Sequence, residues 1–472
     1  MTEDHSRRVT LTVAASFFML LLDGTILNTS LPPMAVALNV PPLTLSAAVT
    51  VYLLAGAAVL PLASWLGDRH GMRRLFVVAI AVFTLASLLC GLAQNAPQLV
   101  LARALQGVGG GLMMPIGRTL VLQRARKEDF IRIAALLTWP ALFAPVLGPP
   151  LGGLITTYGS WRWNFLLNVP LGAVAILLIL RWVPVDTPGE RRPLDRSGAI
   201  GAALGLMLML GGLEWIAHVI GDGAAALPAL LTTGGGIALL AWTVRHLRRV
   251  PHPVVSLAPL AQRTFAVATA SAGTFAAMCL HACPFLLPLL FQLALGRNAV
   301  SSGALLLPYF LGNLGMKSVT TPILVRFGFR NVMVTAGTCS AAAIAAFGFL
   351  SAQTPWAALV ALLFFAGCAR SMLLTALTSL TFADIPLAQR GAASTLSTVS
   401  TQVAATLGVA VGAILLALAQ FVHGHAHLAA PDFRIAFVTM GLIHALTVLR
   451  FWSLPPSAGA DMIGRPAPRA GG

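Results

Sequence analysis

The sequence predicts an all-α polytopic membrane protein with about 14 transmembrane helices. Its 472 residues are 57% hydrophobic and only 9% charged, whereas roughly a quarter of the residues in a soluble globular protein are charged. The mean hydropathy is +0.86. About fourteen apolar runs approach the ~20 residues that an α-helix needs to cross a bilayer. Basic residues gather between these runs, which is typical of a multi-pass protein.

The apolar runs define the expected spans, which end where charges, glycine or proline interrupt the pattern. We place them at 9–31, 44–66, 75–94, 98–121, 132–157, 163–182, 197–219, 226–244, 264–292, 300–324, 331–350, 354–378, 393–419 and 433–452. The longest connection, 181–198, carries prolines and mixed charges and reads as a linker. Because no connection is long enough for a soluble catalytic module, we expect no enzyme.

Lys and Arg are distributed unevenly between the two sides of these spans. With both termini cytoplasmic, the cytoplasmic segments hold 23 of the 30 Lys and Arg residues, and the outer loops hold only Arg162, Arg297 and Arg434. Cytoplasmic loops of membrane proteins are enriched in basic residues, so we expect both termini inside. The formal charge of +16 is therefore explained by the basic residues that set the membrane orientation. We expect no nucleic-acid partner.

Cysteine and histidine give little sign of a metal or cofactor. The five cysteines lie in apolar runs, and only Cys279 and Cys283 are close together, so we expect neither a disulfide nor a cysteine metal site. The segment HGHAH (423–427), in an expected outer loop, has weak metal-binding potential. We assign no metal site and no cofactor.

A basic hairpin occurs twice in the chain. Residues 66–77 (LGDRHGMRRLFV) align with 323–334 (ILVRFGFRNVMV) at an offset of 257. Two six-helix halves separated by two extra helices would give this spacing. The alternative is that any short basic hairpin has this pattern, because glycine permits the turn and arginine holds the cytoplasmic side. The expected parts are an N-terminal bundle, a linker with two extra helices, a C-terminal bundle and a cytoplasmic tail, at 1–185, 186–260, 261–455 and 456–472.

One carboxylate, Asp23, stands in the otherwise uncharged stretch LDGTILNTSLP (22–32) of the first span. An ionised side chain at membrane depth costs at least ~2.5–3.5 kcal/mol on insertion scales, and such residues are functional by default. The alternative is a polar residue that neighbouring backbone satisfies. We take Asp23 as a candidate functional group.

The first copy of the hairpin, SWLGDRHGMRRLF (64–76), predicts a cytoplasmic latch. A glycine permits the tight turn, and Asp68 can pair with a nearby arginine or a helix N-terminus in one conformation and release it in another. The latch residues are Asp68, Arg69, Gly71 and Arg73. Val325 replaces the aspartate in the second copy, so only the first half would carry the ionic latch.

Two further stretches are rich in small residues. LARALQGVGGGLMMPIGR (101–118) holds Arg103, which cannot lose its proton and so needs a permanent acceptor when buried. APVLGPPLGGL (144–154) repeats a small residue every four positions, which makes one narrow face for helix packing, and its prolines can kink the helix.

These four stretches, together with SWRWNFLLNVPLG (160–172), resemble the Major Facilitator Superfamily, in particular its fourteen-helix drug:proton antiporter branch of the EmrB/QacA type. The resemblance covers the chain nearly end to end. It implies a proton-coupling role for Asp23. It also implies that the fifth-span motif, with Ala144, Gly148, Pro149, Gly152 and Gly153, belongs to exporters rather than symporters. We read 160–172 as structural, with its tryptophans in an interfacial belt.

Depth counting tests whether Asp23 and Arg103 can meet. Asp23 lies nine residues before Pro32, and Arg103 lies six after Pro97. At ~1.5 Å rise per residue the two differ by about 5 Å in depth, which is within side-chain reach if the prolines mark comparable levels. Burial raises and a neighbouring cation lowers the pKa of a carboxylate. We hypothesise that Asp23 takes a proton from outside and releases it inward when substrate binds.

Other polar residues within the spans leave alternatives open. Lys317 either snorkels inward or acts as a cavity cation, Arg370 is expected in a cavity or salt bridge, and His281 either packs through a hydrogen bond or titrates. Glu214 is expected at the interface, exposed. The candidate cavity residues are Asn28, Gln106, His281, Lys317 and Arg370.

The leading expectation is a proton-coupled antiporter that exports small, mostly apolar organic compounds across the bacterial inner membrane by alternating access. Since three cations face one core carboxylate, neutral or anionic compounds are favoured over lipophilic cations. The alternatives are a specific metabolite transporter on the same fold or a transporter-like membrane sensor. We expect a monomer, and leave open a periplasmic adaptor with an outer-membrane channel.

Overall fold

The computed structural model describes residues 3–122, 130–185, 193–221, 223–251, 253–455, 457–459 and 462, and all regular secondary structure in these ranges is helical. The core of the expected linker, 186–192, and most of the expected tail lie outside the described residues. Two compact units form: unit 1 is Met1–Val254 with Asn298–Ala304, and unit 2 is Val255–Arg297 with Leu305–Gly472.

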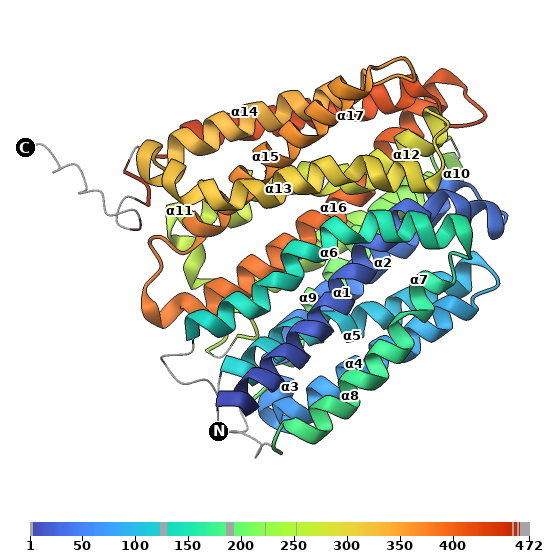
Figure 1. Cartoon of the computed structure of the whole chain (residues 1–472). Helices are drawn as coiled ribbons and strands as arrows, with labels where there is room; N and C mark the ends of the chain where they lie inside the picture. The colour runs from blue at the N-terminus through green and yellow to red at the C-terminus, as the bar shows by residue number, and fades with distance from the viewer. Residues whose placement is uncertain are drawn as a thin grey trace, which may run out of the picture. The chain divides into compact units, whose positions relative to one another are not determined.

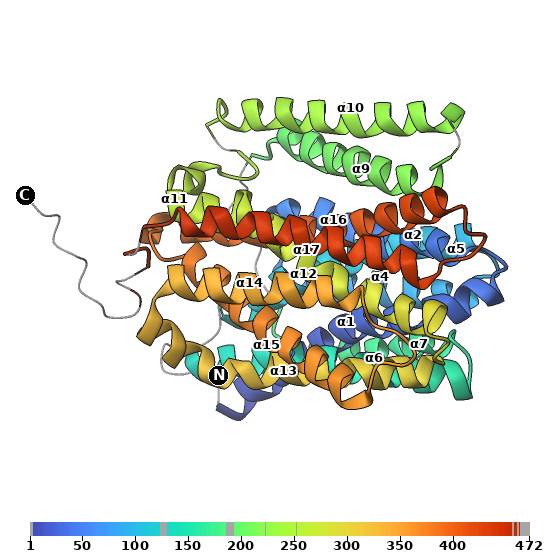
Figure 2. The same ribbon diagram turned by 90° about the horizontal axis from the view of Figure 1, so that it is seen from above.

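Unit 1 contains the helices that carry the N-terminal motifs (Figure 1). They are α1 (Glu3–Ala37), α2 (Ser46–Val59), α3 (Ala63–His70), α4 (Met72–Leu92), α5 (Ala96–Leu122), α6 (Phe130–Tyr158), α7 (Trp163–Leu166), α8 (Asn168–Trp182), α9 (Arg196–His218) and α10 (Gly223–Leu247). Helices α9 and α10 lie side by side (Figure 2), and α9 also packs against α2.

Unit 2 holds the remaining helices. They are α11 (Arg263–Phe265), α12 (Ala272–Leu289), α13 (Ala299–Phe327, whose residues up to Ala304 belong to unit 1), α14 (Phe329–Phe347), α15 (Trp356–Thr381), α16 (Arg390–His423) and α17 (Ala430–Trp452). Its main packing pairs are α14 with α17, α12 with α16 and α14 with α15.

Thirteen helices among the described residues are long and apolar enough to cross a membrane. The remaining expected span, 331–350, forms α14, which is less apolar because Arg330 and Asn331 lie in its first turn. The all-helical, multi-pass fold class predicted by the sequence is therefore confirmed.

Small residues set the close approach of α5 to its neighbours in unit 1. A Cβ at Gly107 would overlap the carbonyl of Tyr52 on α2, and one at Gly109 would meet the backbone of Phe83 on α4. Without glycine at these positions the backbones could not come so near. This packing brings the Arg103 side of α5 into contact with α2 and α4.

Candidate functional site

Asp23 and Arg103 form a buried ion pair inside unit 1. Arg103 Nη1 donates to Asp23 Oδ2 at 2.7 Å, and the two residues are 1% and 2% exposed, respectively. The helices α5 and α1 bring the two side chains into direct contact, within the reach that the residue count from the two prolines suggested. An arginine buried this way needs a permanent acceptor, and Asp23 supplies one.

Two amides donate to the other oxygen of the Asp23 carboxylate. Gln106 Nε2 lies 2.9 Å from Asp23 Oδ1, and Asn168 Nδ2 lies 2.7 Å from the same atom. Both amides also donate to the hydroxyl of Ser87, at 2.7 and 3.3 Å. Four helices of unit 1, α1, α4, α5 and α8, thus contribute polar side chains to one buried network.

Arg103 has further partners besides Asp23. Its Nη1 donates to Gln106 Oε1 at 2.7 Å, its Nε donates to the carbonyl of Ala48 at 3.2 Å, and its Cζ lies 4.0 Å from the centre of the Tyr52 ring. The guanidinium therefore keeps two neutral acceptors and an aromatic face if the carboxylate charge is removed.

Sequence reasoning missed Asn168 and Ser87. Asn168 belongs to the stretch 160–172, which we read as structural, and Ser87 stands alone in an apolar span. An asparagine directly before Val-Pro near the start of a span was the available signal for Asn168. No signal in the sequence marked Ser87, because serine is common in membrane helices.

The fifth-span motif forms the contact between α6 and α1. Thr25 Oγ1 donates to the carbonyl of Ala144 and Thr29 Oγ1 to that of Pro149, both at 3.2 Å. A Cβ at Gly148 or Gly152 would overlap α1. Gly153 points instead toward the first residues of α13 that belong to unit 1. The small face is therefore a helix-packing face next to the helix that carries Asp23.

The hairpin between α3 and α4 turns at Gly71, whose φ is +85°. Arg73 Nη2 donates to the carbonyl of Leu180 at 2.6 Å, and Arg69 Cζ lies 5.3 Å from the centre of the Trp65 ring. Among the described residues no basic side chain lies within ion-pair distance of Asp68. A cavity of about 400 Å³ beside the hairpin is lined by His70, Gly71, Arg73, Arg74, Val77, Val78, Leu180 and Val185.

The candidate cavity residues belong to both units. Gln106 belongs to the Asp23 network, whereas Asn28 lies further along α1 with its Oδ1 buried and, among the described residues, unbonded. In unit 2, Lys317 Nζ donates to Thr375 Oγ1 at 3.2 Å. Arg370 Cζ lies 5.8 Å from the centre of the Tyr309 ring, and His281 on α12 is half-buried.

Glu214 corrects an expectation. It is not exposed at the interface: the side chain is only 5% exposed, accepts a 2.8 Å hydrogen bond from Thr50 Oγ1 and is also bonded to the Ser46 hydroxyl. The reason is that α9 packs its Glu214 face against α2 instead of turning it to lipid. Hydroxyls on the second span thereby satisfy the carboxylate.

The comparisons with known proteins agree with this fold. The sequence profile of the Major Facilitator Superfamily matches residues 13–409 and 269–469. The chain is 34% identical to the "Putative multidrug resistance protein MdtD" of Citrobacter koseri over 466 residues, covering 96% of each chain, and 34% identical to the protein of that name in Pectobacterium atrosepticum, covering 97% of each.

Solved structures show the same architecture at low sequence identity. A D-xylose-proton symporter superposes with a TM-score of 0.66 at 14% identity, over 96% of this chain and 98% of that one. At this identity the likeness shows the fold alone. The profile match and the two relatives show the family: the chain is a multi-pass transporter that belongs to the Major Facilitator Superfamily.

Proposed function

We propose that the protein is a proton-coupled antiporter that exports small, mostly apolar organic compounds by alternating access. The observation that carries the proposal is the buried network around Asp23, in which a carboxylate at membrane depth pairs with Arg103 at 2.7 Å. Such residues in transporters mark ion and proton pathways. The multidrug-resistance name of the relatives supports an organic substrate.

The hydrogen bonds around Asp23 suit both of its charge states. When Asp23 is ionised, Arg103 neutralises it and the two amides fill its second oxygen. When it is protonated, Oδ1 still accepts from the amides, and Arg103 keeps the Gln106 and Ala48 acceptors. In the protonated state Arg103 keeps hydrogen-bond acceptors but loses its counter-charge, which is costly for a buried cation, so release of the proton restores the favourable ion pair.

Proton uptake would act on helix packing through α1. Asp23 lies on the same helix as the threonines that donate hydrogen bonds to α6. A change in the ion pair between Arg103 and Asp23 would therefore act on α1 and on its contact with α6. Release of the Arg103 pair would free α1 to move against α5. In this proposal the Gly71 hairpin, with Asp68, Arg69 and Arg73, is the cytoplasmic latch that holds one of the two conformations.

Charges in unit 2 favour neutral or anionic substrates. Between residues 263 and 423 the only acidic residue is Asp384, which follows the end of α15. Lys317 and Arg370 therefore lie in helices that offer no carboxylate. Arg370 Nε is buried and, within the described residues, has no hydrogen-bond partner. A lipophilic cation beside Lys317 and Arg370 would meet positive charge and no carboxylate from these helices, so we expect it to be disfavoured as a substrate.

We place the protein in the inner membrane of a bacterium, with both termini in the cytoplasm, acting as a monomer. The uneven distribution of Lys and Arg supports the orientation, and the bacterial relatives support the membrane. A periplasmic adaptor and an outer-membrane channel would be the partners if export continues across the outer membrane.

The test is transport in proteoliposomes with an imposed pH gradient. The panel contains a neutral, an anionic and a cationic fluorescent organic compound. The wild type is expected to accumulate the neutral or anionic probe against its gradient, and Asp23→Asn to lose this coupling. Glu214→Gln is the matched control, because it also neutralises a buried membrane carboxylate but lies outside the Asp23 network.

Each of three results would contradict the proposal. Full proton-driven transport by Asp23→Asn would exclude Asp23 as the proton carrier. Transport of one metabolite alone, with no response to the drug-like probes in either the vesicles or a drug-sensitive host, would favour the specific metabolite transporter. Absence of flux for a broad panel in the wild type would favour a membrane sensor.

A further inference from the structure

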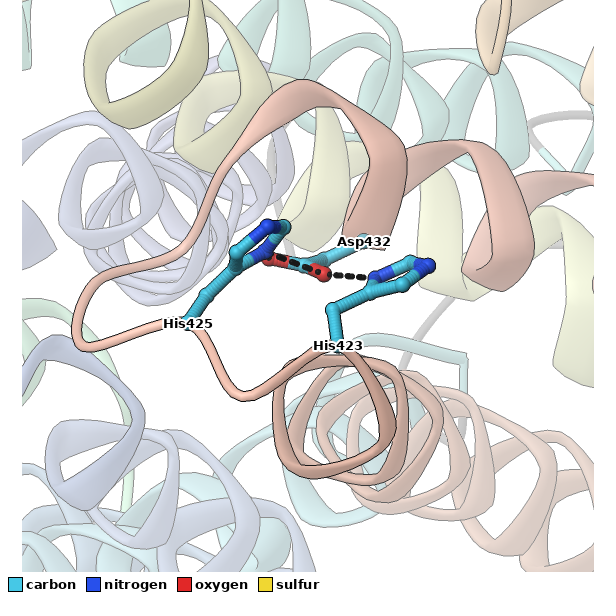
Figure 3. A group of neighbouring side chains, drawn as sticks. All are labelled: His423, His425 and Asp432. Carbon is cyan, nitrogen blue, oxygen red and sulfur yellow. Dashed lines mark hydrogen bonds and ion pairs between the residues drawn. The ribbon is translucent and has the colours of Figure 1, made fainter.

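Three potential metal ligands meet at the hairpin that joins α16 to α17. They are His423, His425 and Asp432, and their ligand atoms all lie within 4.8 Å of one another. His423 Nδ1 lies 2.6 Å from Asp432 Oδ1, and His425 Nδ1 lies 3.0 Å from each oxygen of the same carboxylate. Figure 3 shows both imidazoles turned toward the one carboxylate.

The backbone of the hairpin builds this arrangement without an ion. Gly424 takes a left-handed conformation, with φ of +66°, and ends α16. The His425 N–H then donates to the carbonyl of Gln420 at 3.1 Å, and Gln420 Nε2 donates back to the carbonyl of His425 at 3.1 Å. The left-handed turn lets two histidines separated by a single residue face the same point.

The Asp432 carboxylate is buried and held by the backbone, whereas the two histidines are partly exposed to solvent. The Asp432 side chain is 0% exposed, whereas those of His423 and His425 are 31% and 34% exposed. The Ala429 N–H donates to Asp432 Oδ2 at 2.8 Å, which orients the carboxylate. The nearest basic residue in sequence, Arg434, is directed elsewhere, with its Cζ 5.2 Å from the centre of the Phe349 ring.

We propose that His423, His425 and Asp432 bind a divalent transition-metal ion of the zinc type. Two imidazole nitrogens and one carboxylate oxygen form a ligand set typical of Zn²⁺ and unlike the all-oxygen sets of Ca²⁺ and Mg²⁺. The ion would replace the direct contacts that the two Nδ1 atoms make with the Asp432 carboxylate. Ligand atoms at ~2.0–2.1 Å from zinc are about 3.3 Å apart, so small side-chain rotations suffice.

The ion completes its tetrahedral coordination on the open side of the trio, with water or a ligand from solution. Its effect is to tie the end of α16 to the first turn of α17. Since α17 packs on α14, α12 and α16, the site would stabilise unit 2. The site is independent of the Asp23 network and of the proposed transport activity.

Zinc titration of the purified full-length protein tests the site. The protein carries an affinity tag without histidine, because a polyhistidine tag would itself bind the ion. Calorimetry with ZnCl₂ is expected to show one ion per chain, and thermal unfolding to shift upward when zinc is present. His425→Ala, which removes a ligand but leaves the Asp432 bond to Ala429, is expected to weaken binding at least about tenfold.

His427→Ala is the matched control, because it removes the third histidine of the same loop, which is not part of the trio. It should bind zinc as the wild type does. Equal zinc affinity in wild type and His425→Ala, or loss of binding in His427→Ala, overturns the assignment. No binding by the well-folded wild type overturns it too, and leaves Asp432 as a helix-capping residue that the histidines cover.

Discussion

Gln106 Nε2 donates to Asp23 Oδ1 at 2.9 Å, while Arg103, one turn earlier on the same helix, donates to Asp23 Oδ2 at 2.7 Å. One helix therefore presents a charged and a neutral donor to the two oxygens of one carboxylate. Gln106 can stay hydrogen-bonded to Asp23 when the carboxylate is protonated, whereas Arg103 then loses its ion pair with Asp23. This division of roles makes the neutral donors worth testing separately from Arg103.

Asn168→Ala removes one of the two neutral donors to Asp23 Oδ1. We expect the rate of proton-driven transport to fall several-fold and its pH optimum to change. The reason is that the ionised carboxylate loses a hydrogen bond that favours the ionised form. The measurement is the initial transport rate between pH 5.5 and pH 8.5. Asn164→Ala is the control, since Asn164 bonds Ser30 and Thr156 instead. An unchanged pH profile in Asn168→Ala would remove it from the network's function.

Gly152→Val places a side chain where α6 meets the backbone of α1 at Ile26. The two helices must separate, and we expect a clear loss of thermal stability and of transport together, since packing of small residues drives association of membrane helices. Thermal unfolding of the protein in detergent measures the first effect. Gly234→Val in α10 is the control, because no atom lies within 4 Å of its added Cβ, and it should unfold as the wild type does.

Glu214→Ala leaves the Thr50 hydroxyl buried without its acceptor, whereas the Ser46 hydroxyl keeps the Leu43 carbonyl at 2.6 Å. Polar contacts between membrane helices contribute about 0.6–2 kcal/mol each, so we expect a lower unfolding temperature. Proton coupling should persist in the molecules that remain folded. Thr50→Val, added to Glu214→Ala, is expected to recover stability because no orphaned hydroxyl remains. Failure to recover would mean that the carboxylate acts in some way other than docking α9.

Asp195 links the stability of unit 1 to pH. Burial pushes the pKa of Asp195 up, but hydrogen bonds from His246 Nε2 and the Gly198 N–H, both 2.8 Å, outweigh it and hold the pKa below its usual value. A depressed carboxylate pKa stabilises the fold above the unfolded-state value of about 3.9, and this contribution is lost as the pH falls through the folded-state pKa.

Asp195→Asn keeps a capping side chain for α9 but removes the charge. The expected destabilisation is about 0.3–1 kcal/mol at pH 7, the usual size for a carboxylate at a helix N-terminus. The difference in unfolding temperature between wild type and variant should shrink as the pH falls below about 4. A difference that stays constant from pH 7 to pH 3 would show that the charge of Asp195 does not matter.

Much of the fold followed from the amino-acid sequence because a membrane imposes a simple rule on length and polarity. Each apolar run had to become a helix to satisfy its backbone, and all the expected spans are helices. The ends moved by several residues; for instance, the first span extends to Ala37, because Pro32 and Pro33 do not end α1. The hairpin at Gly71 also forms as its sequence indicated.

The candidate site was only partly accessible to sequence reasoning. The contact of Asp23 with Arg103 could be predicted because their two spans run in opposite directions. Counting residues from the proline near the outer end of each span puts the two side chains within reach of each other. Glu214 was misplaced because its partners, Ser46 and Thr50, lie more than 160 residues earlier and look like ordinary helix residues. Which face of α9 meets α2 is decided by three-dimensional packing. The proton-carrier role of Asp23 stays a prediction.

The two hairpins share one backbone shape. Gly71 before α4 and Gly328 before α14 have φ of +85° and +78°, and each is preceded by an arginine two positions earlier. Only the first has an aspartate directly before that arginine; the second has Val325. The glycine that both copies share is what the bend requires, and Asp68 is what the proposed latch adds in the first copy. The substitution Val325→Asp would give the second hairpin the same aspartate as the first. Transport by this variant would test whether a protein with two such hairpins still moves substrate in one direction.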